Sequence, residues 1–158
     1  MSLGYAGTKQ PYQTYWIKVS PVQQRSAEDL TFFTSPNNMF SDGKQMVTSN
    51  NGTANLLALD LPPGEYQIDS VGAFSDTGPY SWGGLKRPPM VQTKFVIGVG
   101  EVSYLGSALL RRQPDNSLVY VVFDEMDRDI KLLRSIRPDL GTLPTTRVLL
   151  NSETFRKP

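Results

Sequence analysis

Hydrophobic and polar residues alternate with a period of two along most of this chain. Tyr15, Ile17 and Val19 alternate with Thr14, Trp16 and Lys18, which predicts a strand over residues 12–20 with one buried face. The same alternation predicts further strands over 29–35, 65–74, 93–99, 101–112, 118–123 and 147–150. The pattern therefore predicts a mainly β, mostly antiparallel domain of about eight strands over residues 12–150.

The segment from Leu61 to Tyr66 reads Leu-Pro-Pro-Gly-Glu-Tyr and predicts a sharp turn into the long strand 65–74. Pro62 and Pro63 have no backbone N–H to donate to a sheet, so they end the preceding apolar run. Gly64 accommodates the reversal. The alternation changes phase near residues 70–72, which predicts a β-bulge there.

One α-helix is predicted near the end of the domain, over about residues 125–136. Asp124 is the expected N-cap, with Asp127 at the third following position. An apolar stripe at helical spacing faces the core, and Pro138 and Gly141 end the segment. The residues of the stripe are Met126, Ile130, Leu133 and Ile136.

Polar and turn-forming residues predict loose segments at both ends. Residues 1–11 are expected to be a flexible N-terminal arm, and residues 151–158 a C-terminal tail. Met1-Ser2-Leu3 reads like residues added for expression, which implies that a signal segment has been removed. Asn51-Gly52 predicts a turn with positive φ within a loop over residues 48–53.

Composition narrows the possible chemistry. The 158 residues include no cysteine and no histidine, which removes disulfides, thiol nucleophiles, the commonest metal ligand and the usual general base. The net charge is +1, from 16 basic and 15 acidic residues spread along the chain, so nucleic acid is not an expected partner. We expect no cofactor and no enzymatic activity.

An acidic cluster, Asp124, Glu125, Asp127 and Asp129, is the densest group of carboxylates. It could bind calcium or supply paired catalytic carboxylates. An EF-hand beginning at Asp124 would need glycine at its sixth position and glutamate at its twelfth, and these are Asp129 and Ser135. The cluster is therefore interpreted as a helix start, where acidic residues favour the helix dipole.

A Gly- and Pro-rich loop is predicted over residues 75–89, and it carries Tyr80 and Trp82. Exposed aromatic side chains contact sugars or protein partners well. The alternative is that they fold down as a plug over the end of the domain. Tyr80 and Trp82 are thus the candidate contact residues for a partner or ligand.

Two motifs resemble known families. Leu61–Tyr66 resembles the turn of prealbumin-like, or carboxypeptidase-regulatory-like, β-sandwiches. The block from Phe95 to Gly106 is similar to one in uncharacterised bacterial envelope proteins, many of them lipoproteins. Over residues 55–140 the resemblance implies an Ig-like or prealbumin-like β-sandwich in the periplasm or at the outer membrane. Because the chain lacks cysteine, membrane attachment would need a lipid anchor outside these residues.

Taken with the composition, this resemblance predicts a non-enzymatic, exported envelope domain. It would bind or scaffold a protein or glycan partner through its loops. The alternative is a glycan-directed binding domain or hydrolase that uses loop aromatics and two carboxylates. A further alternative is a phage or secretion-apparatus subunit whose edge strand pairs with another chain.

Overall fold

The computed structural model describes residues 1–7, 14–22, 30–34, 46–74, 93–114 and 118–150. Within these residues the fold is mainly β with one α-helix, as predicted. Eleven strands are described, more than the eight or so expected. The strands are β1 (Ser2–Tyr5), β2 (Thr14–Pro21), β3 (Leu30–Thr34), β4 (Met46–Ser49), β5 (Gly52–Leu56), β6 (Gly64–Phe74), β7 (Thr93–Ile97), β8 (Val102–Tyr104), β9 (Ser107–Arg112), β10 (Leu118–Phe123) and β11 (Thr145–Arg147).

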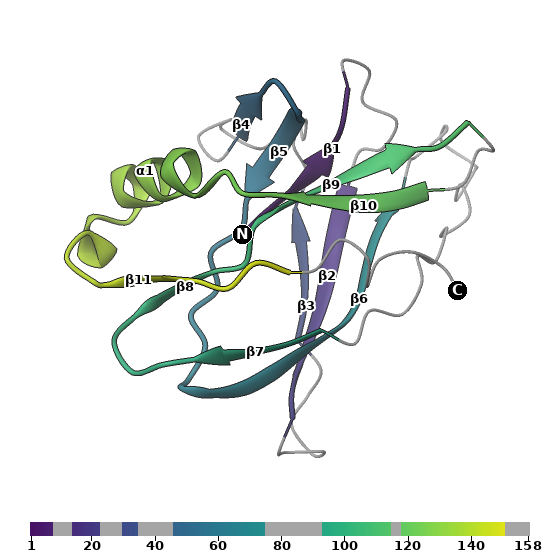
Figure 1. Ribbon diagram of the computed structural model, residues 1–158. Helices are drawn as coiled ribbons and strands as arrows, with labels where there is room; N and C mark the ends of the chain where they lie inside the picture. The colour runs from purple at the N-terminus through teal and green to yellow at the C-terminus, as the bar shows by residue number, and fades with distance from the viewer. Residues whose placement is uncertain (8–13, 23–29, 35–45, 75–92, 115–117, 151–158) are drawn as a thin grey trace.

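The described strands form three sheets (Figure 1). A five-stranded sheet has the order β10-β9-β1-β5-β4, and a four-stranded sheet has the order β3-β2-β6-β7. The strands β11 and β8 form a separate pair. Most neighbours are antiparallel, but β1 runs parallel to β9 and β11 runs parallel to β8.

The strand β1 is central to the five-stranded sheet. It pairs with β5 on one side and β9 on the other, and all four of its residues are buried. The prediction of a flexible arm over residues 1–11 is therefore wrong for Ser2–Tyr5. A four-residue segment with two small residues, Ser2 and Gly4, shows no clear alternation, so its burial comes from pairing on both sides rather than from its own pattern.

The four-stranded sheet follows the sequence prediction closely. β2 pairs along its length with β6, and β3 lies on the other side of β2. The register shifts between Lys18, opposite Ser70, and Val19, opposite Ile68. Asp69 is the extra residue, so the predicted bulge is confirmed one residue before the predicted position.

The predicted strand 101–112 is instead two strands in different sheets. β8 ends at Tyr104 and β9 begins at Ser107, with Gly106 between them at φ +100°. A φ in this range favours glycine and turns the chain from one sheet into the next. Residues 104–110 are buried on both faces, which conceals the break from a period-two analysis.

Side chains from the two larger sheets form one hydrophobic core. Ile17, Ile68 and Val71 project from the four-stranded sheet, and Leu3, Ala108 and Tyr120 project from the five-stranded sheet. Tyr66, the third residue of β6, stacks on Phe95 of β7, with ring centroids 5.8 Å apart. This core fixes the two sheets against each other.

The helix α1 (Met126–Ile136) is confirmed, and its stripe packs on Leu56 of β5 and Tyr104 of β8. Its N-cap is Glu125, one residue later than predicted, and no side chain caps the helix end. Asp124 instead accepts a hydrogen bond from the backbone N–H of Met126 at 3.3 Å. A short 3₁₀ turn, η1 (Pro138–Leu140), follows.

The loop expected over 48–53 is a hairpin, with β4 and β5 around the turn and Gly52 at φ +150°. The last strand lies at Thr145–Arg147 instead of 147–150, although Val148 and Leu150 still donate backbone hydrogen bonds to Tyr104 and Leu105. Residues 8–11, 75–89 and 151–158 lie outside the described residues.

Candidate functional site

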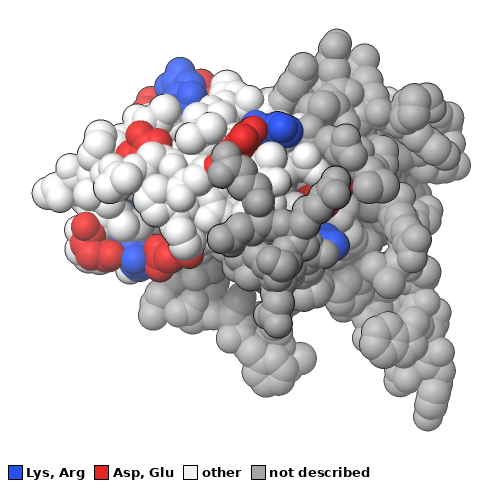
Figure 2. Space-filling view, turned by 90° about the horizontal axis from the view of Figure 1, so that it is seen from below, with Lys and Arg blue, Asp and Glu red and all other residues white. Residues whose placement is uncertain are grey.

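The candidate contact residues Tyr80 and Trp82 lie outside the described residues. On the face shown in Figure 2, acidic and basic side chains of the described residues lie next to one another. Among the described residues no group of three or more carboxylates is arranged to hold a metal ion. No helix in the described part of the chain has the length and apolar character needed to cross a bilayer.

The acidic cluster separates into residues with different environments. Asp124 pairs with Arg147 at 3.0 Å, and Asp127 is exposed. Asp129, by contrast, has no exposed surface. The helix-start interpretation agrees with Asp127 and Asp129 lying in the first turn, but it misses the burial of Asp129.

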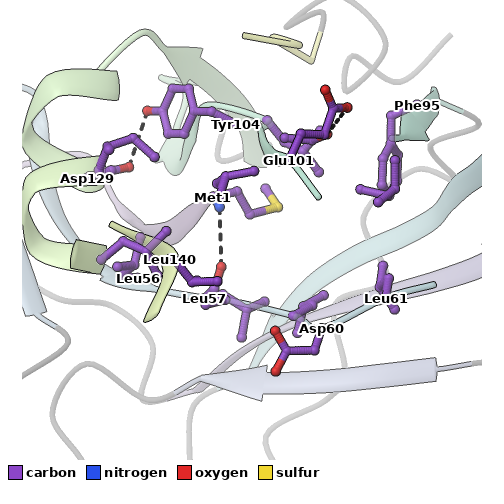
Figure 3. Close-up of a pocket in the computed structure, with 18 of the residues that line it drawn as sticks. Met1, Leu56, Leu57, Asp60, Leu61, Phe95, Glu101, Tyr104, Asp129 and Leu140 are labelled. Carbon is purple, nitrogen blue, oxygen red and sulfur yellow. Dashed lines mark hydrogen bonds between the residues drawn. The ribbon is translucent and has the colours of Figure 1, made fainter. Parts of the chain in front are cut away.

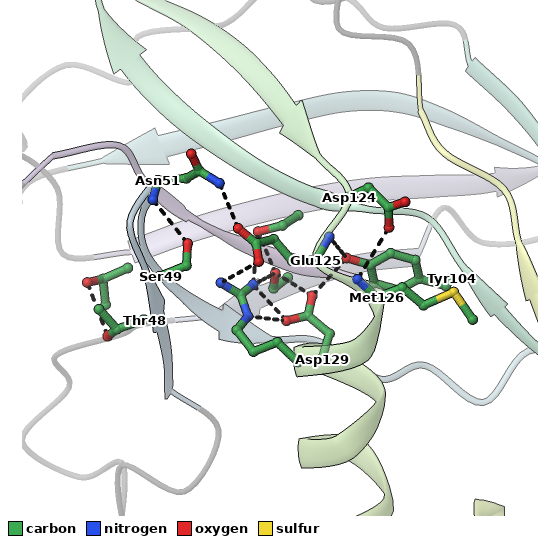
Figure 4. A network of polar contacts seen from close by, with 12 residues as sticks. Thr48, Ser49, Asn51, Tyr104, Asp124, Glu125, Met126 and Asp129 are labelled. Carbon is green, nitrogen blue, oxygen red and sulfur yellow. Dashed lines mark hydrogen bonds and ion pairs between the residues drawn. The ribbon is translucent and has the colours of Figure 1, made fainter.

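Asp129 is the centre of a buried polar network that joins α1 to three strands (Figure 4). Its Oδ1 accepts a hydrogen bond from Arg128 Nε at 2.8 Å and forms an ion pair with Arg128 Nη2 at 2.7 Å. Its Oδ2 lies 2.8 Å from Ser2 Oγ and 3.2 Å from the Tyr104 hydroxyl. Ser107 Oγ lies 2.8 Å from Ser2 Oγ. The network compensates the cost of burying a carboxylate.

The direction of each hydrogen bond in this network follows from which groups carry a proton. A hydroxyl has one proton, and the carboxylate of Asp129 can only accept. Ser2 therefore donates to Asp129, and Ser107 donates to Ser2. The Tyr104 hydroxyl donates to Asp129 and accepts from the backbone N–H of Glu125 at 3.1 Å. Burial, reinforced by the negative charge of Asp129, raises the pKa of Tyr104, so this hydroxyl keeps its proton near neutral pH.

The outer side of the network reaches the β4–β5 hairpin. Glu125 lies 3.9 Å from Arg128 and accepts a hydrogen bond from the amide of Asn51 at 2.7 Å. Ser2 and Ser107 are wholly buried, so neither hydroxyl is accessible to a substrate in this conformation. The arrangement therefore serves to hold the start of β1 and the start of α1 together.

A cavity of about 490 Å³ lies beside this network (Figure 3). In the close-up, Tyr104 and Asp129 lie on one side of Met1 and Phe95 lies on the other. Its walls come from β2, β7, β8, α1 and the segment 56–62. The apolar side chains that line it include Ile17, Leu56, Leu61, Ile97, Ile130, Leu133 and Leu143. Its size and apolar walls are typical of a small-molecule site.

The α-amine of Met1 lies in the wall of this cavity and donates to the carbonyl of Leu57 at 3.2 Å. Burial lowers the pKa of this amine from about 8 to about 6, and the nearby negative charge of Asp129 partly offsets that effect. The amine is therefore largely uncharged above pH 7. The cavity wall is a poorly solvated environment at this point.

Three carboxylates line the cavity, and the described lining contains no lysine or arginine. Asp129 is paired with Arg128, and Asp60 lies 3.2 Å from Arg137. Glu101 differs, because its described partners are neutral donors. These donors are the backbone N–H of Gly98 at 2.9 Å, Thr146 Oγ1 at 2.9 Å and Ser103 Oγ at 3.4 Å.

Neither the polar network nor the cavity was predicted from the sequence. One signal was available, since Asp129 lies three residues after Met126 and four before Leu133, on the apolar stripe itself. A carboxylate at that position indicates a buried, paired acid. No comparable signal marks Ser2 or the cavity, because both depend on contacts between distant segments.

The chain matches no protein-family model, no curated protein sequence and no solved structure. The resemblance to prealbumin-like sandwiches and envelope proteins therefore stays a prediction.

Proposed function

We propose that this chain is a non-enzymatic binding domain that takes a small apolar ligand into the cavity between its sheets and α1. The observation that carries this proposal is the 490 Å³ cavity with its wall of leucine and isoleucine side chains. Burial of an aliphatic chain contributes roughly 0.8 kcal/mol for each CH₂ group, so a cavity of this kind can supply useful affinity.

The setting that we propose is the bacterial envelope, with the domain exported and located in the periplasm or at the outer membrane. The support is the resemblance of Leu61–Tyr66 and Phe95–Gly106 to envelope-protein motifs. Two sheets that share one core are compatible with a prealbumin-like sandwich, which we propose as the finer description of the fold. Contact with a protein or glycan through Tyr80 and Trp82 remains a prediction.

The binding proposal can be tested with N-phenyl-1-naphthylamine, an uncharged probe whose fluorescence rises in apolar sites. We expect saturable binding to the full chain. Methyl NMR spectra should then show shifts at Ile130 and Leu133, which line the cavity. The methyl groups of Val47 and Leu109 should not move, because they belong to a separate core cluster.

Absence of saturable binding would overturn the proposal. So would shifts of the same size at Val47 and Leu109, because the probe would then bind elsewhere or loosen the whole fold. The envelope setting is tested separately, by fractionation of cells that express the natural gene. Recovery of the protein in the cytoplasm would contradict it.

A further inference from the structure

We infer that the cavity selects amphiphiles with an aliphatic chain and an uncharged or cationic head group, and rejects fatty-acid-like anions. This inference rests on the proposed binding function and adds the chemical class of the ligand. It follows from the charges around the cavity. The apolar wall accounts for the aliphatic chain, and the carboxylates account for the head group.

An anionic head group would find no free cation in the described wall. Arg128 is held by Asp129 through two nitrogens, and Arg137 is held by both Asp60 and Asp139. The Met1 amine is largely uncharged above pH 7, because burial lowers its pKa to about 6. A carboxylate ligand would thus lose its hydration and gain no pairing in return.

A cationic or hydroxyl head group could pair with the carboxylate of Glu101. This carboxylate lines the cavity, and its described partners are neutral donors. Its negative charge is therefore not neutralised by a described cation. A protonated amine could form a charge-assisted hydrogen bond with it, and an alcohol could donate a neutral one.

The expected preference comes from the charges around the cavity and not from the net charge of the chain, which is +1. A weakly positive protein would attract a fatty-acid anion slightly, if net charge alone decided binding. A preference for amines over carboxylates would therefore report on the cavity itself.

The test uses three ligands with the same chain, decylamine, decanol and decanoate, to displace N-phenyl-1-naphthylamine at low salt and about pH 7.5. We expect decylamine and decanol to displace the probe at concentrations at least about tenfold lower than decanoate. The Glu101→Gln variant keeps an acceptor for Gly98 and removes the charge. In it, the ratio of amine to decanoate affinity should fall at least about threefold.

Asp127→Asn is the matched control, since it removes one exposed negative charge on α1 away from the cavity wall. Its ratio of decylamine affinity to decanoate affinity should equal that of the unmodified protein. Probe binding with decanoate at least as strong as decylamine would refute the ligand class and leave the binding function in place. An equal fall in the ratio for both variants would refute the role of Glu101. Failure of the probe to bind at all would refute the binding function itself.

Discussion

The hydroxyl oxygen of Ser2 lies 2.8 Å from Oδ2 of Asp129, although 127 positions separate the two residues. Both side chains are wholly buried. The contact joins the first strand to the first turn of the helix, and it lies next to the cavity that Asp129 also lines. The geometry of the candidate site therefore depends on the polar network.

Replacement of Asp129 by alanine should destabilise the protein by roughly 3–5 kcal/mol, because Arg128, Ser2 and Tyr104 would lose a charged partner in a buried site. Urea denaturation near neutral pH measures the loss. The control is Asp127→Ala on the same helix turn, which should cost about 1 kcal/mol or less because the residue is exposed. Equal losses in the two variants would contradict a central role for Asp129.

Stability should increase with pH between about 6 and 8. The Met1 amine has a pKa of about 6 in the folded protein, against an ordinary value of 8. Between these values the unfolded chain binds a proton that the folded protein does not, so the free energy of unfolding rises with pH. A shift of this size corresponds to roughly 2–3 kcal/mol.

The composition of the chain leaves no side chain that is expected to titrate in this interval. The chain contains no histidine and no cysteine, so no side chain has an ordinary pKa within the interval. Urea midpoints measured at several pH values through this range will show the rise. A flat profile would mean that the amine is solvated in the folded protein.

Gly106 should be far less tolerant of alanine than Gly7, although both have a strongly positive φ, +100° and +107°. A Cβ atom at Gly106 would lie 2.6 Å from Val122 Cγ1, whereas at Gly7 it would meet nothing within 4 Å. Both substitutions place alanine at a positive φ, where backbone strain costs roughly 1 kcal/mol or more, and the difference between the two variants reports the steric clash. Thermal unfolding of the two variants compares them directly, and equal losses would place Gly106 in open space.

Local patterns predicted those elements whose burial is one-sided. The segments 12–20 and 125–136 were predicted within two residues of β2 and α1, because each has one face more buried than the other. The phase change that marks the bulge at Asp69 was visible for the same reason. One-sided burial leaves a period in the sequence that can be recognised without a partner.

Elements buried on both sides gave no such period. Serine and glycine are common in loose segments, so the composition of Ser2–Tyr5 predicts an arm, yet these small residues fit between β5 and β9. The break at Gly106 was hidden within a continuous buried run. The cavity could not be predicted, since its walls come from segments as far apart as Ile17 and Leu143.

The Leu61–Tyr66 turn supplies a last prediction, because its tyrosine both packs and hydrogen-bonds. The Tyr66 hydroxyl donates to the carbonyl of Pro62 at 2.8 Å, four residues earlier, while its ring stacks on Phe95. Tyr66→Phe keeps the ring and removes the hydrogen bond. The substitution should lower the free energy of unfolding by roughly 1 kcal/mol. This is a small loss for a buried donor, because Pro62 is exposed and water can reach its carbonyl.

Glu65→Gln in the same turn is the matched comparison. It weakens a salt bridge to Lys94 at 3.4 Å, between side chains that are 36% and 56% exposed, so the loss should be near zero. Urea denaturation of both variants at high salt and low salt separates the two contributions. Salt should remove any effect of the Glu65 change and leave that of Tyr66→Phe intact. A Tyr66→Phe variant as stable as the parent would show that ring packing alone holds the turn against the start of β6.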